Sequence, residues 1–275
     1  MTATTAPATP TTSPAGVAAT GARPVKDAIT MAWRNLLNLR RTPELVVFAT
    51  IQPIIFVLMF VYVFGGAISS SVPGGVPYVD FLMPGVFVQT VTFGSLQTGV
   101  GLAEDLQKGI IERFRSLPMA RSAVLVGRTL ADLVRNVFVI ALMVVIGFAV
   151  GWTIHTNAVA TLAGLALVLG FAYSLSWVFA IVGLSSPDGE TAQAASFPVL
   201  APLVFASSAF VPVSTMPGWL QTFARHQPVT VVVNAVRALT LGGPARADVL
   251  AALAWIVGLV AVCAPIAVAR YRKVV

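Results

Sequence analysis

The feature that most constrains this chain is a series of long apolar stretches almost free of charged residues. A helix needs about 20 residues, at about 1.5 Å rise each, to cross the hydrocarbon of a bilayer. The stretches predict six membrane-spanning helices, of which the third begins in a helix that also carries Asp132 and Arg135. The predicted spans are residues 45–64, 81–103, 129–154, 159–184, 192–212 and 249–269.

Composition points to the same class of protein. Of the 275 residues, 57% are hydrophobic and 10% are charged, whereas a soluble domain carries about 25% charged residues. A soluble fold of this size has too little interior to bury so much apolar surface. We therefore expect an all-α integral membrane protein. Several predicted spans contain proline, and we expect the clearest break at the Pro198–Pro202 pair.

The positive charges are distributed unequally between the two sides that six spans would create. Fourteen of the 17 Lys and Arg residues fall in the N-terminal segment, in the connection between spans two and three, and at the C-terminus. The other side carries Arg225, Arg237 and Arg246. Because cytoplasmic segments are enriched in Lys and Arg, we expect both termini in the cytoplasm and the chain in the cell membrane.

The segment before the first span divides into two parts. Residues 1–22 are nearly all Thr, Ala, Pro, Ser and Gly, which predicts a disordered tail rather than a signal peptide. Residues 23–44 contain a basic amphipathic helix over 26–41, with Ile29 and Trp33 on its apolar face. This helix fits the membrane surface, either as an anchor in lipid or as a docking element for a partner.

The cytoplasmic connection after span two has a helical pattern of its own over residues 104–118. Leu106, Ile110, Phe114 and Leu117 form an apolar stripe, and Glu104 with Lys108 forms an i,i+4 pair of opposite charge. A mixed-charge helix with an apolar face is typical of a docking surface for a soluble protein. The acidic connection 185–193 is explained by a turn at Pro-Asp-Gly.

The segment before span six is apolar but interrupted by prolines at 212, 217 and 228. Pieces of this length at membrane depth are usually re-entrant or interfacial. We expect two short helices, at about 217–226 and 229–240, which act as an exit gate or pack as an irregular loop. We interpret His226 as a hydrogen-bonded loop residue rather than as a metal ligand.

The sequence lacks the residues that several classes of function require. No lysine lies in G-x-x-x-x-G-K-[ST], so the chain has no phosphate loop of its own. The single cysteine, Cys263, excludes an internal disulfide, and we expect no metal. The charge-free spans disfavour a secondary carrier, because Asp80 and Asp132 are interpreted as span-edge residues. An intramembrane enzyme is the remaining alternative, and no constellation of catalytic residues supports it.

Two motif groups then resemble a known family. The first is Glu104-Asp105, Lys108-Gly109 and the stretch Glu112–Met119, followed by Arg128. The second is Phe210-Val211-Pro212, then Met216–Leu220, then His226-Gln227-Pro228. Together with the order of elements, these resemble the permeases of type 2 ABC transporters, and within them the drug-resistance branch typified by daunorubicin-resistance permeases of actinobacteria.

The resemblance implies a role for each group of residues. The helix after span two would be the coupling helix that docks on a separate ATPase subunit, which binds ATP and Mg²⁺; this chain would bind no cofactor. The amphipathic helix would lie beside that ATPase, and spans one and five would border the substrate path. The implied residues are, for coupling, Glu104, Asp105, Lys108, Gly109, Glu112, Arg113, Arg115, Leu117 and Pro118; for the interface helix, Trp33, Arg34, Leu37 and Arg40; for the path, Gln52, Phe56, Phe197 and Phe205; and for the outer gate, Pro212, Pro217, Trp219 and His226.

The resemblance also implies an assembly and a cargo. Two permeases, identical or related, would combine with two ATPases in the lipid membrane, with no nucleic-acid partner. The cargo would be an amphipathic drug or natural product. Sister branches move cell-envelope lipids or polysaccharides, so an exporter of those molecules is the alternative.

Overall fold

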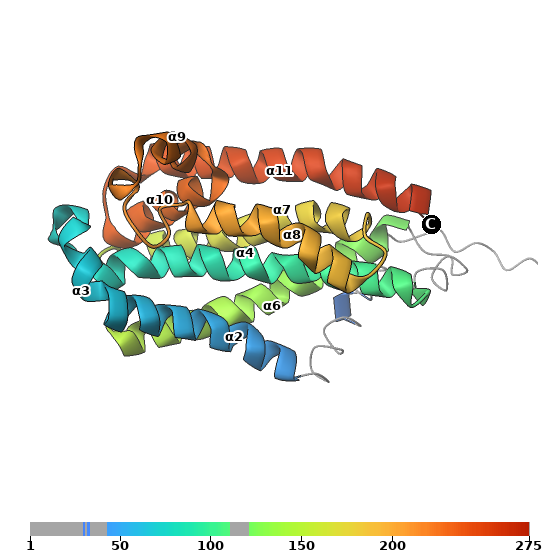
Figure 1. The fold of residues 1–275 in the computed structure, drawn as a ribbon, viewed down its shortest axis with the longest axis horizontal. Helices are drawn as coiled ribbons and strands as arrows, with labels where there is room; N and C mark the ends of the chain where they lie inside the picture. The colour runs from blue at the N-terminus through green and yellow to red at the C-terminus, as the bar shows by residue number, and fades with distance from the viewer. Residues whose placement is uncertain (1–29, 31, 34–42, 111–120, 275) are drawn as a thin grey trace, which may run out of the picture.

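The structure is a computed structural model that describes residues 30, 32–33, 43–110 and 121–274. Long helices lie side by side along one axis, and the described residues contain no strand (Figure 1). The elements are α2 (Pro43–Leu58), η1 (Met59–Phe64), α3 (Gly65–Ile68), η2 (Ser69–Ser71), η3 (Pro73–Gly75), α4 (Tyr78–Gln107), α6 (Arg121–Val150), α7 (Ala158–Gly183), α8 (Gly189–Phe205), η4 (Val213–Thr215), α9 (Gly218–His226), α10 (Pro228–Leu241) and α11 (Ala245–Val274).

Within the described residues, five helices are long and apolar enough to cross a membrane, and they match five of the six predicted spans. They cover Thr50–Ser71, Tyr78–Gln107, Leu125–Val150, Ala158–Gly183 and Ala245–Lys273. The first continues through a π-helical segment, η1, into α3. The predicted third span is shifted: α6 begins at Arg121 and ends at Val150, because Gly151 takes a φ of 99° that stops the helix.

The predicted fifth span differs more. α8 has 17 residues and ends at Phe205, seven residues before the predicted end. Its last carbonyls are capped from another element, since the Gln227 side-chain amide donates to Leu203 O at 2.9 Å and to Ala206 O at 3.2 Å. The break predicted at Pro198–Pro202 is wrong, because α8 is continuous there. A proline removes one N–H, and the flanking hydrogen bonds can hold the helix.

Although α8 is short, α8 and residues 206–210 together follow α4 from near its last turn to its start. At the start of α8, a Cβ on Gly189 would lie 2.9 Å from Glu104 Cγ at the end of α4. Beyond its last residue, Phe210 O accepts a hydrogen bond from Tyr78 Oη, at the start of α4, at 3.0 Å. The C-terminus lies at the same end of the bundle as the α8 start, while α3, α9 and α10 lie at the opposite end (Figure 1). We call these the C-terminal end and the α9–α10 end.

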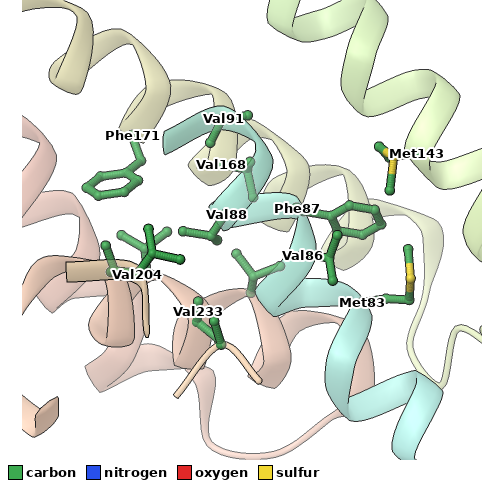
Figure 2. Close-up of a cluster of buried hydrophobic side chains, with 14 of the residues drawn as sticks. Met83, Val86, Phe87, Val88, Val91, Met143, Val168, Phe171, Val204 and Val233 are labelled. Carbon is green, nitrogen blue, oxygen red and sulfur yellow. The ribbon is translucent and has the colours of Figure 1, made fainter. Parts of the chain in front are cut away.

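α4 is the central helix. In its span, 83% of the most apolar window is buried, against 6% for α11, so α11 lies at the periphery. Figure 2 shows the core around α4, where Phe87 and Val88 face side chains from α6, α7, α8 and α10. Those side chains include Met143, Val168, Phe171, Val204 and Val233. Because lipid is as apolar as this core, close van der Waals packing of these side chains, rather than their removal from water, holds the helices together.

The two short helices predicted before span six are confirmed as α9 and α10. They meet at Gln227, whose backbone is extended with ψ 149° because Pro228 follows it. Pro228 then occupies the first turn of α10, where its missing N–H has no helical partner to lose. The chain therefore reverses direction at the α9–α10 end before it enters α11.

Membrane sidedness can be tested with cysteines in a Cys263→Ala background. Ser214 and Ser185 are both exposed and lie at opposite ends of the bundle. In intact cells, an impermeant maleimide is expected to label Ser214→Cys and to leave Ser185→Cys unlabelled until the membrane is opened. The reverse pattern would place the α9–α10 end in the cytoplasm and overturn the orientation predicted from the positive charges.

Candidate functional site

The predicted coupling segment begins as the last turn of α4 rather than as a separate helix from Glu104. α4 runs on to Gln107, and Gly109 takes a φ of 64° just beyond it. The predicted Glu104–Lys108 pair is confirmed, with 3.0 Å between Oε2 and Nζ. Both side chains are exposed, so the pair contributes only about 0.3–0.5 kcal/mol.

A second ion pair in this region joins two helices, and the sequence pattern did not indicate it. Arg128 Nη1 of α6 lies 2.9 Å from Asp105 Oδ2 of α4, and the two side chains are only 20% and 19% exposed. The same nitrogen donates to Gly101 O at 3.1 Å. Gly101 leaves room for this contact, since a Cβ there would collide with the guanidinium. The pair therefore joins α4 and α6, the helices on either side of residues 109–120.

Only some of the remaining predicted coupling and interface residues lie in the described part of the chain. Lys108 and Gly109 lie at the C-terminal end beside the Asp105–Arg128 pair. Trp33 is helical and exposed. The residues that lie outside the described part of the chain are Glu112, Arg113, Arg115, Leu117, Pro118, Arg34, Leu37 and Arg40. Their roles stay predictions.

The connection before α8 also lies at the C-terminal end of the bundle, and the side chain of its Asp188 caps the helix. Asp188 Oδ1 accepts from the Thr191 backbone N–H at 2.7 Å, as an N-cap. This hydrogen bond lowers the pKa of the Asp188 carboxyl.

Two predicted path residues meet in an aromatic cluster between α2–η1 and α8. Phe56 and Phe205 have ring centroids 6.4 Å apart. Both rings also contact Phe210, at 6.0 Å and 5.9 Å, and Phe210 stacks on Phe60 at 4.5 Å with an interplanar angle of 8°. Offset stacks of this kind favour planar aromatic molecules as neighbours. Phe197 is exposed on α8 and lies outside this cluster.

The other predicted path residue, Gln52, borders a different feature. It is exposed at the edge of a pocket between α2, α4 and α6 with a volume of about 90 Å³. The structure therefore places Phe56 and Phe205 in the aromatic cluster, Gln52 at a separate pocket, and Phe197 in neither.

The outer-gate residues lie at the α9–α10 end. Pro212 is buried, while Pro217 and Trp219, at the start of α9, are exposed. His226 is exposed, and its Nδ1 lies 2.9 Å from Thr222 O. The interpretation of His226 as a hydrogen-bonded residue is confirmed, and its role in a gate stays a prediction.

Arg237 is the most consequential residue that the sequence analysis misplaced. It was counted with the exposed charges of the outer side, yet it is 9% exposed in the middle of α10. Its Nε donates to Phe81 O at 2.9 Å and its Nη2 to Ser208 O at 2.6 Å, and the guanidinium lies 3.5 Å from the Phe81 ring centroid. A lone arginine inside the run VVVNAVRALTL was the available signal.

The span-edge interpretation is confirmed for Asp80, the third residue of α4, and is wrong for Asp132. Asp132 is buried well inside α6, where it accepts from Thr98 Oγ1 at 2.5 Å and pairs with Arg135 at 3.2 Å. Asp80 is fully buried at the start of α4, with His155 Nε2 at 2.8 Å and the Thr153 backbone N at 2.7 Å. These acids are tolerated because each one has polar partners within reach.

Comparisons with known proteins agree with these features. The sequence matches the ABC-2 type transporter family over residues 27–241. It is 35% identical to the daunorubicin resistance ABC transporter permease protein DrrB1 of Streptomyces coeruleorubidus, over 90% of this chain and 87% of that protein. It is 26% identical to the probable doxorubicin resistance permease DrrC of Mycobacterium tuberculosis (83% and 82%) and 23% identical to the putative transport permease ycf38 of Cyanophora paradoxa (78% and 74%). The chain therefore belongs to the ABC-2 type transporter family.

Proposed function

We propose that this chain is the membrane permease of an ATP-driven exporter that moves an amphipathic drug or natural product out of the cell. The observation that carries the proposal is the 35% identity, over nearly the whole chain, to a permease named for daunorubicin resistance. The aromatic cluster supports it, because Phe205 exposes a ring beside Phe56, and an exposed aromatic ring suits a planar polycyclic cargo.

The energy would come from a separate ATP-binding subunit that carries ATP and Mg²⁺. The sequence has no phosphate loop, so hydrolysis by that motif has to occur on another chain. Residues 104–118 would dock on that subunit. The Asp105–Arg128 pair supports this role, because it joins the two helices that flank the segment and would transmit movement to both.

The assembly would contain two permeases with six spans each and with both termini in the cytoplasm. The course of α8 and residues 206–210 along α4 supports a sixth span in addition to the five long helices. α2 and α8 both expose large apolar residues, among them Ile55, Leu58, Phe197 and Phe205. Faces of this kind can meet a second copy as well as lipid.

The test combines recovery of the partner with transport. Tagged chain extracted in mild detergent is expected to bring down an ATPase that carries a phosphate loop. Inverted membrane vesicles containing both proteins are expected to accumulate daunorubicin only with hydrolysable ATP. Arg128→Ala is expected to lower this uptake by about tenfold, a typical coupling free energy between two sites, because it leaves the largely buried Asp105 carboxylate unpaired.

Arg272→Ala is the matched control, because it removes an exposed arginine at the same end of the bundle but outside residues 104–118, and it is expected to leave uptake near the wild-type rate. Uptake that persists without ATP, or recovery of the chain without any ATPase, would refute the proposal. Equal uptake by the two variants would refute the coupling role of the Asp105–Arg128 pair alone.

A further inference from the structure

The pocket between α2, α4 and α6 combines apolar surface with several polar side chains, in a chain whose helices are otherwise mostly apolar. Gln52 and Gln97 are exposed, while Gln89, Thr90 and Asn136 are buried at 2%, 8% and 2% exposure. Gln89 lies 11 residues into α4, about 16 Å along the helix at about 1.5 Å per residue. The polar groups are therefore near the middle of the bundle, where water is scarce.

Each of the three buried polar side chains of this pocket has one atom without a hydrogen-bond partner. Gln89 Oε1, Thr90 Oγ1 and Asn136 Nδ2 are all without one. Nearby hydroxyls of α4 behave differently, since Thr92 Oγ1 donates to Val88 O at 2.6 Å and Ser95 Oγ donates to Val91 O at 2.7 Å. A buried polar group without a partner costs about 1–3 kcal/mol. Three such groups around one pocket indicate that something else supplies their partners.

The unpartnered atoms define what would fit. They are a carbonyl acceptor, an amide donor and a hydroxyl that can do both. The terminal torsions of Gln89 and Asn136 are soft, so each side chain can exchange its oxygen and nitrogen toward the pocket. Phe93, Pro53 and Val139 complete the wall with apolar surface. The lining thus combines neutral hydrogen-bonding groups with apolar contact, as in ligand sites generally.

The pocket is not arranged for an anion, although Arg135 lines it. Arg135 Nη1 lies 3.2 Å from Asp132 Oδ1, and Nη2 donates to Gly94 O at 2.6 Å. Asp132 is itself held by Thr98 Oγ1. The charge of Arg135 is therefore balanced within the protein, and a phosphate or carboxylate would have to displace the Asp132 carboxylate.

We propose that this pocket binds a neutral hydroxyl-, carbonyl- or amide-bearing part of the exported amphiphile, with Gln89, Thr90 and Asn136 as its hydrogen-bonding partners. The proposal rests on the proposed function in taking the occupant to be the cargo of an exporter. It assigns polar recognition to α2, α4 and α6, apart from the aromatic cluster between α2–η1 and α8.

The test measures binding of a small amphiphile in the pocket in the absence of ATP. The permease is placed in lipid nanodiscs with two substitutions, Cys263→Ala and the reporter Gln97→Cys. The rate at which a maleimide labels the cysteine at position 97 is then measured with each of three octyl amphiphiles, below their micellar concentrations. Octyl glucoside is neutral and rich in hydroxyls, octyl sulfate is anionic and octyltrimethylammonium is cationic. Octyl glucoside is expected to slow labelling, and the two charged amphiphiles are expected to have little effect.

Gln89→Met, Thr90→Val and Asn136→Leu are each expected to weaken this protection about tenfold, the loss expected for one good hydrogen bond. Thr92→Val is the matched control, because its hydroxyl already has a partner on α4. The three pocket variants are also expected to melt no lower than the wild type without amphiphile, since each removes an unpartnered polar atom.

Equal protection by all three amphiphiles, no protection by octyl glucoside, or full protection in all three pocket variants would each overturn the inference. No protection would mean that the pocket holds only water. Because labelling uses no ATP and no drug, a failure of daunorubicin export would refute the proposed function and leave this result standing.

Discussion

Replacing Arg237 by alanine is expected to destabilise the permease by about 3–5 kcal/mol, a large part of the about 5–15 kcal/mol that holds a typical domain folded. Arg237 donates to Phe81 O on α4 and to Ser208 O and Ala209 O, at 2.9, 2.6 and 3.3 Å. Three separate parts of the chain therefore meet at one guanidinium.

Alanine would leave the carbonyls of Ser208 and Ala209 without this donor in a buried place, at about 1–3 kcal/mol each. It would also remove the cation–π contact with Phe81, which lies 3.5 Å from the guanidinium. Lysine is expected to recover only part of the loss, because an ammonium lacks the planar fork that reaches several carbonyls at once.

The effect can be measured by thermal unfolding in detergent, followed by size-exclusion chromatography of fluorescently tagged protein. Arg246→Ala provides the control, since Arg246 lies exposed at the same end of the bundle. We expect the control to melt within a few degrees of the wild type and Arg237→Ala to elute largely as aggregate. If the two variants had the same melting temperature, the contacts of Arg237 would not be what stabilises the α9–α10 end.

Replacing Gly183 by alanine is expected to disrupt the packing of α4 against α7. α4 and α7 cross where Gly99 faces Gly183, and a Cβ on Gly183 would collide with the backbone of Gly99, including its carbonyl oxygen. A Cβ on Gly99 would lie 2.5 Å from Phe179 O. Since neither obstacle is a flexible side chain, the helices would have to separate, at a cost of about 1–3 kcal/mol or more.

Gly258→Ala is the matched control, and its effect is expected to have the opposite sign. A Cβ on Gly258 in α11 would meet nothing within 4 Å, so the higher helix propensity of alanine should stabilise by about 0.5–1 kcal/mol. Melting temperatures of the purified variants check both expectations. A Gly183→Ala protein as stable as Gly258→Ala would show that α4 and α7 do not touch at this crossing.

The sequence predicted features that depend on neighbours along the chain. Five spans were recognisable because a helix in lipid must be long and apolar. α9 and α10 were recognisable because proline and glycine interrupt an apolar segment. The Glu104–Lys108 pair followed from the spacing of one helical turn. The family resemblance rested on the order of such local motifs, and the family match over residues 27–241 confirms it.

The tertiary structure decided which helix faces meet. Arg237 bonds to Phe81, 156 residues away, and Arg135 bonds to Gly94, 41 residues away. Helical spacing does not indicate such partners. In a soluble helix, polarity separates the buried face from the exposed one, whereas here lipid and core are both apolar and the two faces carry similar residues. The order of the helices and the approximate position of most of them could therefore be predicted from the sequence alone. The burial of Arg237 and the pocket lined by Gln89, Thr90 and Asn136 emerged only when the helices packed.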